Sequence, residues 1–246
     1  ATRRCYDQIF ISVAYAHQNV KIVGSDPGVT AEYNGGTHMP FEDMALMRAV
    51  PHMVCFEPTD ATMLEKAVDQ IVDYPGAVYI RMQRKKAEKV FDESLNFKLG
   101  KAVEIKGGKD VTLIASGIMV ARAVEAAEAL KQEGIDARVV NIHTWKPIDK
   151  DEIIKCAKET GAIVTCENHN VCNGLGSAVA EVLARHIVEA AFERPVLAQI
   201  LVYPHLGIEI SRGVGIAAAA GTPDEVARKA PAIGHCELRC QLEHGK

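Results

Sequence analysis

Polar side chains that could contact a ligand are concentrated in one glycine-rich segment, residues 24–51 (GSDPGVTAEYNGGTHMPFEDMALMRAVP). The β-branched residues at 20–25 predict a buried strand before this segment, and Pro40 suits the first turn of a short helix within it. Backbone N–H groups converge on ligands where strands end and helices begin. The candidate contacts are Asp26, Thr30, Glu32, Asn34, Thr37 and His38. We therefore predict a binding site here, with tight turns as the alternative explanation of the glycines.

The elements that must position this segment alternate between strand and helix, which is typical of an α/β protein with a parallel sheet. In the first half, strands are predicted at 20–25, 52–58 and 77–82. A helix capped by Thr59 or Asp60 should bury Leu64, Val68 and Ile71 on one side. The second half repeats the pattern, with Asp149 and Glu152 as a capping arrangement for the helix at 149–160.

A Lys-rich, weakly periodic stretch separates the two halves and marks a domain boundary. We expect a first domain at 1–90, a linker at 91–109 and a second domain at 110–246. Beyond residue 190 the pattern of the tail is not readable, apart from a predicted strand in VLAQILVY.

Composition excludes several classes of function. The net charge of −4 argues against a nucleic-acid platform, and the sequence contains no apolar run long enough to cross a bilayer. Seven scattered cysteines favour reduced thiols in a cytoplasm over a disulfide framework. The tail spacing His235-Cys236-x3-Cys240-x3-His244 lacks the CxxC pairs of most structural zinc sites, so we expect no metal ligands in this chain.

Several motifs occur in a fixed order along the chain. RRCYDQIF, NVKIVGS, GGTHMPFEDMALMRAVP, FEPTDATMLEKAV and AVYIRMQR occupy the first half. DVTLIASGIMV, VVNIHTWKPID and TCENHNVCNGLGSAVAEVL follow in the second. Over about residues 3–185 this order resembles the pyrimidine-binding and C-terminal domains of the transketolase family. The resemblance implies two tandem three-layer α/β domains with mainly parallel sheets, as in the second polypeptide of a split transketolase.

The resemblance also implies the chemistry, which is transfer of a two-carbon ketol unit between sugars with thiamine diphosphate. His38, in the GTHM motif, matches the family's histidine that bonds substrate hydroxyls and shuttles protons. Arg84, which ends IRMQR, matches the arginine that holds the sugar phosphate, and its planar fork suits phosphate oxygens. For Arg81 the sequence does not separate a salt bridge from a ligand contact.

Two loop residues depart from the family pattern. Asp26 stands where common transketolases carry a histidine near the substrate phosphate, and Asn34 stands where they carry an aspartate that contacts the donor. A carboxylate near a dianionic phosphate repels it, whereas an amide keeps hydrogen bonding without charge. We therefore expect an altered substrate, including unphosphorylated sugars, with Asp26 binding a sugar hydroxyl.

The resemblance further implies that the site is incomplete in this chain. The family's cofactor-activating glutamate and the aromatic residue that stacks on the cofactor lie upstream of RRCYDQI, before Ala1. The ligands of the diphosphate and of Mg²⁺ are expected from an N-terminal transketolase subunit, in a heterotetramer or a dimer. We expect the isolated chain to be inactive, with an unpaired edge on its first sheet.

Three other functions fit parts of the sequence. A deoxyxylulose-phosphate synthase or a 2-oxo-acid dehydrogenase β-subunit would share the superfamily, although the uninterrupted THMPFEDMALMRAVP run favours transketolase. A non-catalytic scaffold subunit would explain the missing glutamate and the altered loop. His38 and Arg84 argue against a scaffold, which needs neither.

Overall fold

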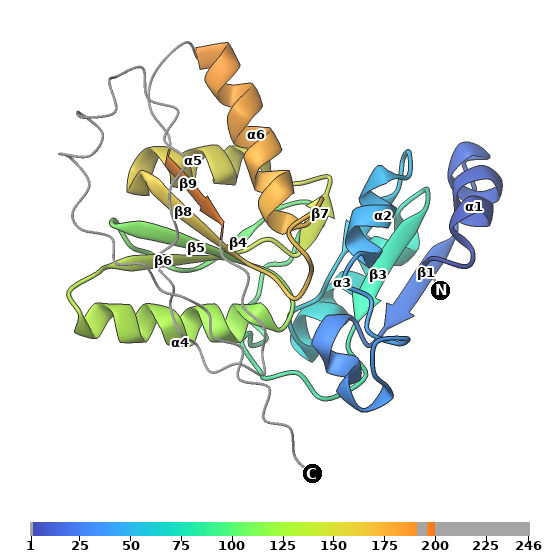
Figure 1. Ribbon diagram of the computed structural model, residues 1–246, viewed down its shortest axis with the longest axis horizontal. Coiled ribbons are helices and arrows are strands. Elements are labelled where there is room, and N and C mark those ends of the chain that lie inside the picture. The colour runs from blue at the N-terminus through green and yellow to red at the C-terminus, as the bar shows by residue number, and fades with distance from the viewer. Residues whose placement is uncertain (1, 191–195, 200–246) are drawn as a thin grey trace.

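The chain folds around two β-sheets that lie side by side, each flanked by helices (Figure 1). The computed structural model describes residues 2–190 and 196–199. None of the helices in these ranges is long and apolar enough to span a bilayer. The Cys/His-rich tail spacing lies outside the described residues.

The first sheet has the order β1-β3-β2-β7. Strands β1 (Lys21–Ser25), β2 (Val54–Phe56) and β3 (Val78–Met82) are parallel. Two helical segments precede β1, namely α1 (Tyr6–Gln8) and η1 (Ile9–Tyr15). Three more connect the parallel strands, namely η2 (Gly28–Asn34), α2 (Asp43–Ala49) and α3 (Ala61–Asp73). Strand β7 (Thr144–Lys146), from the second half of the chain, pairs antiparallel with β2. The second half of the sequence thus completes the first sheet.

The second sheet has the order β4-β6-β5-β8-β9. Strands β5 (Val111–Ala115), β6 (Ala137–Asn141), β8 (Ala162–Cys166) and β9 (Val196–Gln199) are parallel. Antiparallel β4 (Val103–Lys106) lies in the stretch that we expected to link the domains. Helix α4 (Met119–Gln132) covers one face, and α5 (Lys150–Thr160) and α6 (Leu175–Ala190) cover the other (Figure 1). The predicted α/β class, with two domains and mostly parallel sheets, is confirmed.

Local sequence signals placed the helix starts well. Asp60 caps α3, its carboxylate accepting from the backbone N–H of Met63 at 2.9 Å. Asp149 caps α5 by accepting from the N–H of Glu152 at 3.4 Å. A side-chain acceptor at these positions satisfies an N–H group that has no partner inside the helix.

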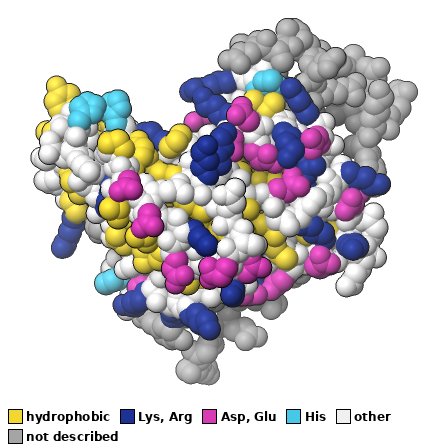
Figure 2. Space-filling view, turned by 180° about the vertical axis from the view of Figure 1, so that it is seen from behind, with side chains coloured by type: hydrophobic (Ala, Val, Ile, Leu, Met, Phe, Trp, Pro, Cys, Tyr) yellow, Lys and Arg dark blue, Asp and Glu magenta, His cyan; other side chains and the backbone are white. Residues whose placement is uncertain are grey.

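One burial prediction was wrong and a second was wrong in part. The strand at 21–25 is a sheet edge rather than a buried strand, because β1 pairs only with β3 among the described strands, and Val23 is 52% exposed. Exposed apolar side chains on η1 and β1 form part of the molecular surface there (Figure 2). On α3 the predicted stripe holds in part, since Ile71 is buried and Leu64 packs against the core, but Val68 is 45% exposed and the fully buried stripe runs through Met63, Ala67 and Ile71. The i, i+4, i+8 spacing of that stripe follows the turn of a straight helix.

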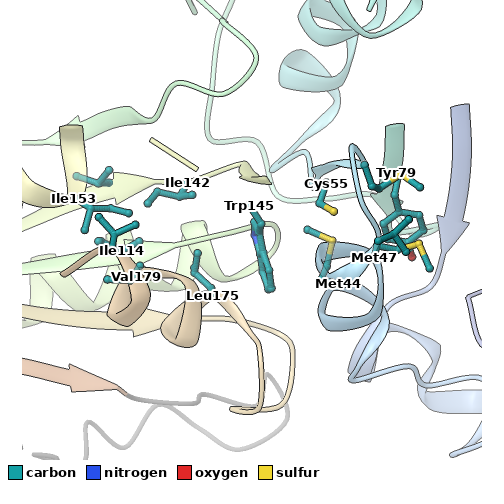
Figure 3. Close-up of a cluster of buried hydrophobic side chains, with 14 of the residues drawn as sticks. Met44, Met47, Cys55, Tyr79, Ile114, Ile142, Trp145, Ile153, Leu175 and Val179 are labelled. Atoms are coloured by element: carbon teal, nitrogen blue, oxygen red, sulfur yellow. The ribbon is translucent and has the colours of Figure 1, made fainter. Parts of the chain in front are cut away.

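One hydrophobic cluster joins the two domains. Trp145 is 1% exposed and lies between residues of the first sheet and those of the second (Figure 3). Met44, Met47, Cys55 and Tyr79 lie on one side of it, and Ile114, Leu175 and Val179 on the other. Because apolar burial stabilises by about 25 cal/mol per Å², this shared core favours a fixed placement of the domains.

Candidate active site

The polar loop begins where β1 ends, at the carboxyl edge of the first sheet. Asp26 has a φ of +59°, and its backbone N–H donates to the carbonyl of Met82 in β3 at 2.9 Å. An aspartate tolerates this left-handed conformation better than most residues. The bond anchors the start of the loop beside the end of β3, and the left-handed backbone at Asp26 ends the extended strand.

The structure brings two of the predicted site residues together. The guanidinium of Arg84 lies 3.1 Å from Oδ2 of Asp26, and the backbone N–H of Arg84 donates to Oδ1 at 3.3 Å. The Asp26 side chain is 11% exposed, whereas that of Arg84 is 67% exposed. The carboxylate therefore holds one side of the guanidinium and leaves most of it open to solvent. Binding of a sugar hydroxyl by Asp26 stays a prediction.

His38 and Asn34 lie on the exposed part of the same loop. The backbone N–H of His38 donates to the carbonyl of Gly35 at 3.0 Å, and its ring Nδ1 lies 2.9 Å from the hydroxyl of Thr37. Asn34 ends the η2 segment. These contacts are local and fix the turn. They engage Nδ1 of His38 and not its other ring nitrogen, Nε2.

The two threonines of the loop have structural partners. Thr30 donates its hydroxyl to the carbonyl of Pro27 at 2.6 Å, and Thr37 pairs with His38. The side chain of Glu32 lies outside the described residues.

Beneath the loop, Arg81 lies in a fully buried charge cluster. Its guanidinium donates to Asp43 at 2.9 Å, to Glu57 at 2.6 Å and to the backbone carbonyl of Asn168 at 2.8 Å. The open choice for Arg81 is therefore settled as a salt bridge with two carboxylates. Because Asn168 belongs to the second domain, the same side chain also links the domains.

The ion pairs determine the charges of this cluster. Burial alone would raise the pKa of Asp43, but the charge and hydrogen bond of Arg81 lower it below its ordinary value. Burial opposes the charged form of Arg81, and the two carboxylates raise its pKa nonetheless. Burial and the neighbouring Asp43 raise the pKa of Tyr79, whose hydroxyl donates to Asp43 at 2.9 Å. The cluster thus holds two carboxylates and one guanidinium in a site without water access.

A third buried carboxylate, Glu167, faces the start of α6. It accepts from the backbone N–H groups of Leu175 at 2.6 Å and Gly176 at 3.0 Å. Burial raises the pKa of Glu167, and these two N–H groups partly offset the rise. The first N–H groups of a helix favour an anion, so Glu167 fastens α6 to the end of β8.

His169 is a neutral, buried histidine. Its Nδ1 donates to the carbonyl of Asn170 at 2.8 Å, and its Nε2 accepts from the backbone N–H of Ala45 at 3.3 Å. A second proton on the ring would face the Ala45 N–H group. Burial, and then the charge of Arg81, lower its pKa to about 4.

Sequence reasoning missed this buried cluster. Glu57 directly follows β2 and Glu167 directly follows β8, so both are acidic residues at carboxyl ends of predicted strands. An acidic residue at the carboxyl end of a predicted strand was the signal in the sequence, since a charged residue buried at such a position needs a partner. Glu167 accepts from residues only eight and nine positions further on, but the partner of Glu57, Arg81, lies 24 residues away, which no local pattern reveals.

A hollow of about 360 Å³ lies next to the end of β3. It is lined by Gln83 and Lys86 from the first domain and by Gly117 and Arg122 from the second. A larger hollow of about 450 Å³ lies at the opposite end of β2, beside Asp69 and Asp73. The smaller hollow is lined by Gln83, the neighbour of Arg84 in sequence, so we associate it with the candidate site.

Two family models together match most of the chain. The pyrimidine-binding domain of transketolase matches residues 1–89, and the transketolase C-terminal domain matches residues 100–209. The chain belongs to the transketolase family. Its two domains are therefore the pyrimidine-binding domain, which carries the Asp26–Arg84 pair, and the C-terminal domain.

Relatives with described functions are similar over the same region. The chain is 52% identical over 186 residues, 76% of its length, to the 6-deoxy-6-sulfo-D-fructose transketolase subunit SqwH of Clostridium sp. (strain MSTE9). It is 42% identical over 75% of its length to a putative transketolase C-terminal section of Methanocaldococcus jannaschii. It is 39% identical over 75% of its length to a subunit of the apulose-4-phosphate transketolase of Phocaeicola vulgatus. These matches span 58%, 58% and 60% of the three relatives.

Among solved structures, the chain resembles a split-gene transketolase described as an inactive β4 tetramer. The TM-score is 0.73 and the sequences are 40% identical, over 82% of this chain and 63% of that one. The observed transketolase fold of both domains is thus shared with a separately encoded transketolase subunit.

Proposed function

We propose that this chain is the C-terminal subunit of a two-subunit transketolase that transfers a two-carbon ketol unit between sugars. The observation that carries the proposal is the Asp26–Arg84 pair, in which an exposed guanidinium is held at the carboxyl ends of adjacent strands β1 and β3. Such strand ends are where ligands of parallel α/β sheets bind. The names of two relatives, which describe them as transketolase subunits, support a separate N-terminal partner.

The residues of this chain fit the substrate side of a thiamine diphosphate site rather than its metal side. Among the described residues, no group of three His, Cys, Asp or Glu side chains could hold a metal ion. The loop offers an imidazole, an amide and a guanidinium, which suit sugar hydroxyls and an anionic group. Thiamine diphosphate, when bound, supplies the nucleophile and the electron sink. Its diphosphate and Mg²⁺ would be held by the partner subunit.

In this proposal Arg84 binds the anionic group of the sugar, and Asp26 limits the negative charge that this group can carry. Asp26 cancels one positive charge within 3.1 Å of the guanidinium. At an effective dielectric constant between about 20 and 80, a second negative charge about 6 Å from that carboxylate costs roughly 1 to 3 kcal/mol. A sulfonate carries one charge, whereas a phosphate ester carries nearly two. The pair therefore favours a monoanionic group such as the sulfonate of a sulfosugar.

His38 would orient the hydroxyl groups of the sugar and exchange a proton with them. Its ring is exposed on the loop, and Nδ1 is engaged by Thr37 at 2.9 Å. This contact leaves Nε2 as the nitrogen that faces a substrate. Histidine exchanges protons readily near neutral pH, which suits that task.

Reconstitution tests the proposal. The chain is combined with its N-terminal partner, thiamine diphosphate, Mg²⁺ and an aldose phosphate as acceptor, and ketol transfer to it is measured from 6-deoxy-6-sulfofructose and from fructose 6-phosphate. Pyruvate serves as the donor that a deoxyxylulose-phosphate synthase or a 2-oxo-acid dehydrogenase would use. We expect ketol transfer by the complex and none by the isolated chain. Turnover of pyruvate alone would reject the transketolase assignment, and a verified complex without any turnover would identify a scaffold.

The variant Asp26→His tests the role of the carboxylate in selecting the anion. Removing the negative charge should shift the ratio of kcat/KM for phosphorylated against sulfonated donors toward phosphate by about tenfold, or roughly 1.4 kcal/mol. Glu65→Gln is the matched control, since it removes a carboxylate from the exposed face of α3. An unchanged ratio in Asp26→His would sink this role.

A further inference from the structure

The loop that bears the candidate substrate residues is held by a residue of the other domain. Asn168 follows β8 in the C-terminal domain and is 1% exposed. Its side-chain Nδ2 donates to the carbonyl of Pro27 at 3.0 Å, and its Oδ1 accepts from the backbone N–H of Val29 at 3.2 Å. One amide thus satisfies a donor and an acceptor of the loop backbone, directly after Asp26.

The backbone of Gly28, between these two contacts, lies close against the side-chain amide of Asn168. A Cβ atom at this position would lie 2.1 Å from Oδ1 of Asn168, and the backbone has a φ of +52°. Both the contact and the left-handed conformation require glycine. The Gly28 N–H also donates to the carbonyl of Pro40 at 2.8 Å, which closes the loop on itself.

The next two residues hold the other arm of the loop. The backbone N–H of Asn170 donates to the carbonyl of Phe41 at 2.9 Å, and His169 accepts from the N–H of Ala45. Residues 168–170, which we call the interdomain clamp, therefore contact both arms that flank 34–38. Arg81 donates to the backbone carbonyl of Asn168, so the clamp rests on the buried charge cluster.

We infer that Asn168 is a positioning residue of the transketolase site, acting through the loop that carries Asp26 and His38. This inference rests on the proposed function. A loop fixed at both arms presents its polar groups in one arrangement before substrate binds, which lowers the ordering cost of binding. Asn168 contacts no substrate in this account. It determines where Asp26, and with it Arg84, meets the sugar.

Amide hydrogen exchange on the full chain tests the clamp without any assay of activity. Asn168→Ala should accelerate exchange in the backbone of residues 27–34 by about tenfold or more, because protection reports the free energy of local opening. Val171→Ala is the control, since it trims an exposed side chain (46%) of the same loop. Equal protection of 27–34 in Asn168→Ala and Val171→Ala would overturn the inference.

Kinetics of the reconstituted complex separate positioning from simple stability. Asn168→Ala should raise the donor KM about tenfold while kcat changes by less than about threefold, since the loop can still adopt the productive arrangement. Asn168→Asp keeps the acceptor for Val29 but loses the donor to Pro27, so it should not restore the wild-type KM. A wild-type KM in Asn168→Asp would show that the Pro27 contact is not used and overturn the inference.

A double-variant cycle tests the same contact from the loop side. Gly28→Ala should raise the donor KM at least as much as Asn168→Ala. Its effect should shrink when Asn168 is already alanine, because the clash with Oδ1 is then gone and only the strain of the left-handed backbone remains. Independent effects would contradict a direct contact. If the wild-type complex catalyses no ketol transfer, the proposed function fails, and hydrogen exchange still decides on the clamp.

Discussion

Arg81 and Arg84 lie three residues apart near the end of β3, and each is paired with an aspartate. The side chain of Arg81 is fully buried between Asp43 and Glu57, whereas that of Arg84 is 67% exposed beside Asp26. Burial makes the first group a fixed structural charge, since removing a partner leaves an uncompensated ion. Exposure leaves the second group free to exchange water for a ligand. Environment, rather than residue type, separates the structural arginine from the candidate binding residue.

The largest effect is expected when Arg81 is replaced. Arg81→Met leaves Asp43 and Glu57 buried without a counter-ion, so we expect unfolding to be about 3–5 kcal/mol easier. Denaturant unfolding measures this effect, with Arg122→Met as the control because Arg122 pairs with Glu125 on the surface. A loss of unfolding free energy under about 1 kcal/mol would show that water or protons can replace the arginine as the partner of the two carboxylates.

At Arg84 the expected loss is in activity. Arg84→Gln should lower kcat/KM for anionic donors about 100-fold, equivalent to roughly 3 kcal/mol, and leave the free energy of unfolding nearly unchanged. The reconstituted complex provides the first measurement, and the isolated chain provides the second. Neutral sugars should lose much less, and an equal loss for neutral and anionic donors would contradict the assignment of Arg84 to the anion.

Acid should destabilise the chain through His143 and His169, the two histidines that are buried in the described part of the chain. Burial lowers the pKa of both His143 and His169 from 6.5 to about 4. Between these values the unfolded state binds more protons, so stability is complete above about pH 6.5 and falls as the pH falls toward 4. Each histidine should contribute about 1.5 kcal/mol to the loss between pH 6.5 and 5.

Single variants His143→Gln and His169→Gln isolate each contribution. Each should flatten the pH dependence of unfolding, and differences between variants avoid the opposing contribution of Glu167, whose pKa burial raises. A slope unchanged in both variants would mean that other groups cause the acid sensitivity.

The smallest effect belongs to an ion pair on the surface. Lys66 lies 3.4 Å from Glu93, whose side chain is 80% exposed. Lys66→Met should change the free energy of unfolding by less than about 0.5 kcal/mol, because water screens the pair. Thermal unfolding in low and high salt checks this expectation. A large, salt-dependent loss of unfolding free energy would contradict the difference that we draw between buried and exposed ion pairs.

Much of the fold was readable because its signals are local. The caps at Asp60 and Asp149 act over three residues, and the alternation of strands and helices follows periodicity. The sequence indicated an unpaired edge on the first sheet but not that β1 itself would form it, and the joining of β7 to that sheet was not readable. Both depend on which strands meet in space, and the pairing of β2 with β7 joins residues about ninety positions apart.

Of the candidate site, the sequence named Asp26 and Arg84 but not their contact, and it left Arg81 undecided. It missed Asn168, whose partners Pro27 and Val29 lie 141 and 139 residues away. Asparagines in loops are common, and only their surroundings distinguish a clamp from a turn.

The sequence by itself determined the family, the order of elements and the loop in which the polar residues gather. These follow from short-range periodicity, capping and ordered motifs. Only the tertiary structure decided that Arg81 is buried with two carboxylates, that Arg84 stays exposed beside Asp26, and that the C-terminal domain holds the loop through Asn168. The physical reason is that burial and long-range hydrogen bonds are set by which surfaces pack together, and the same residue type changes its role when water is removed from it.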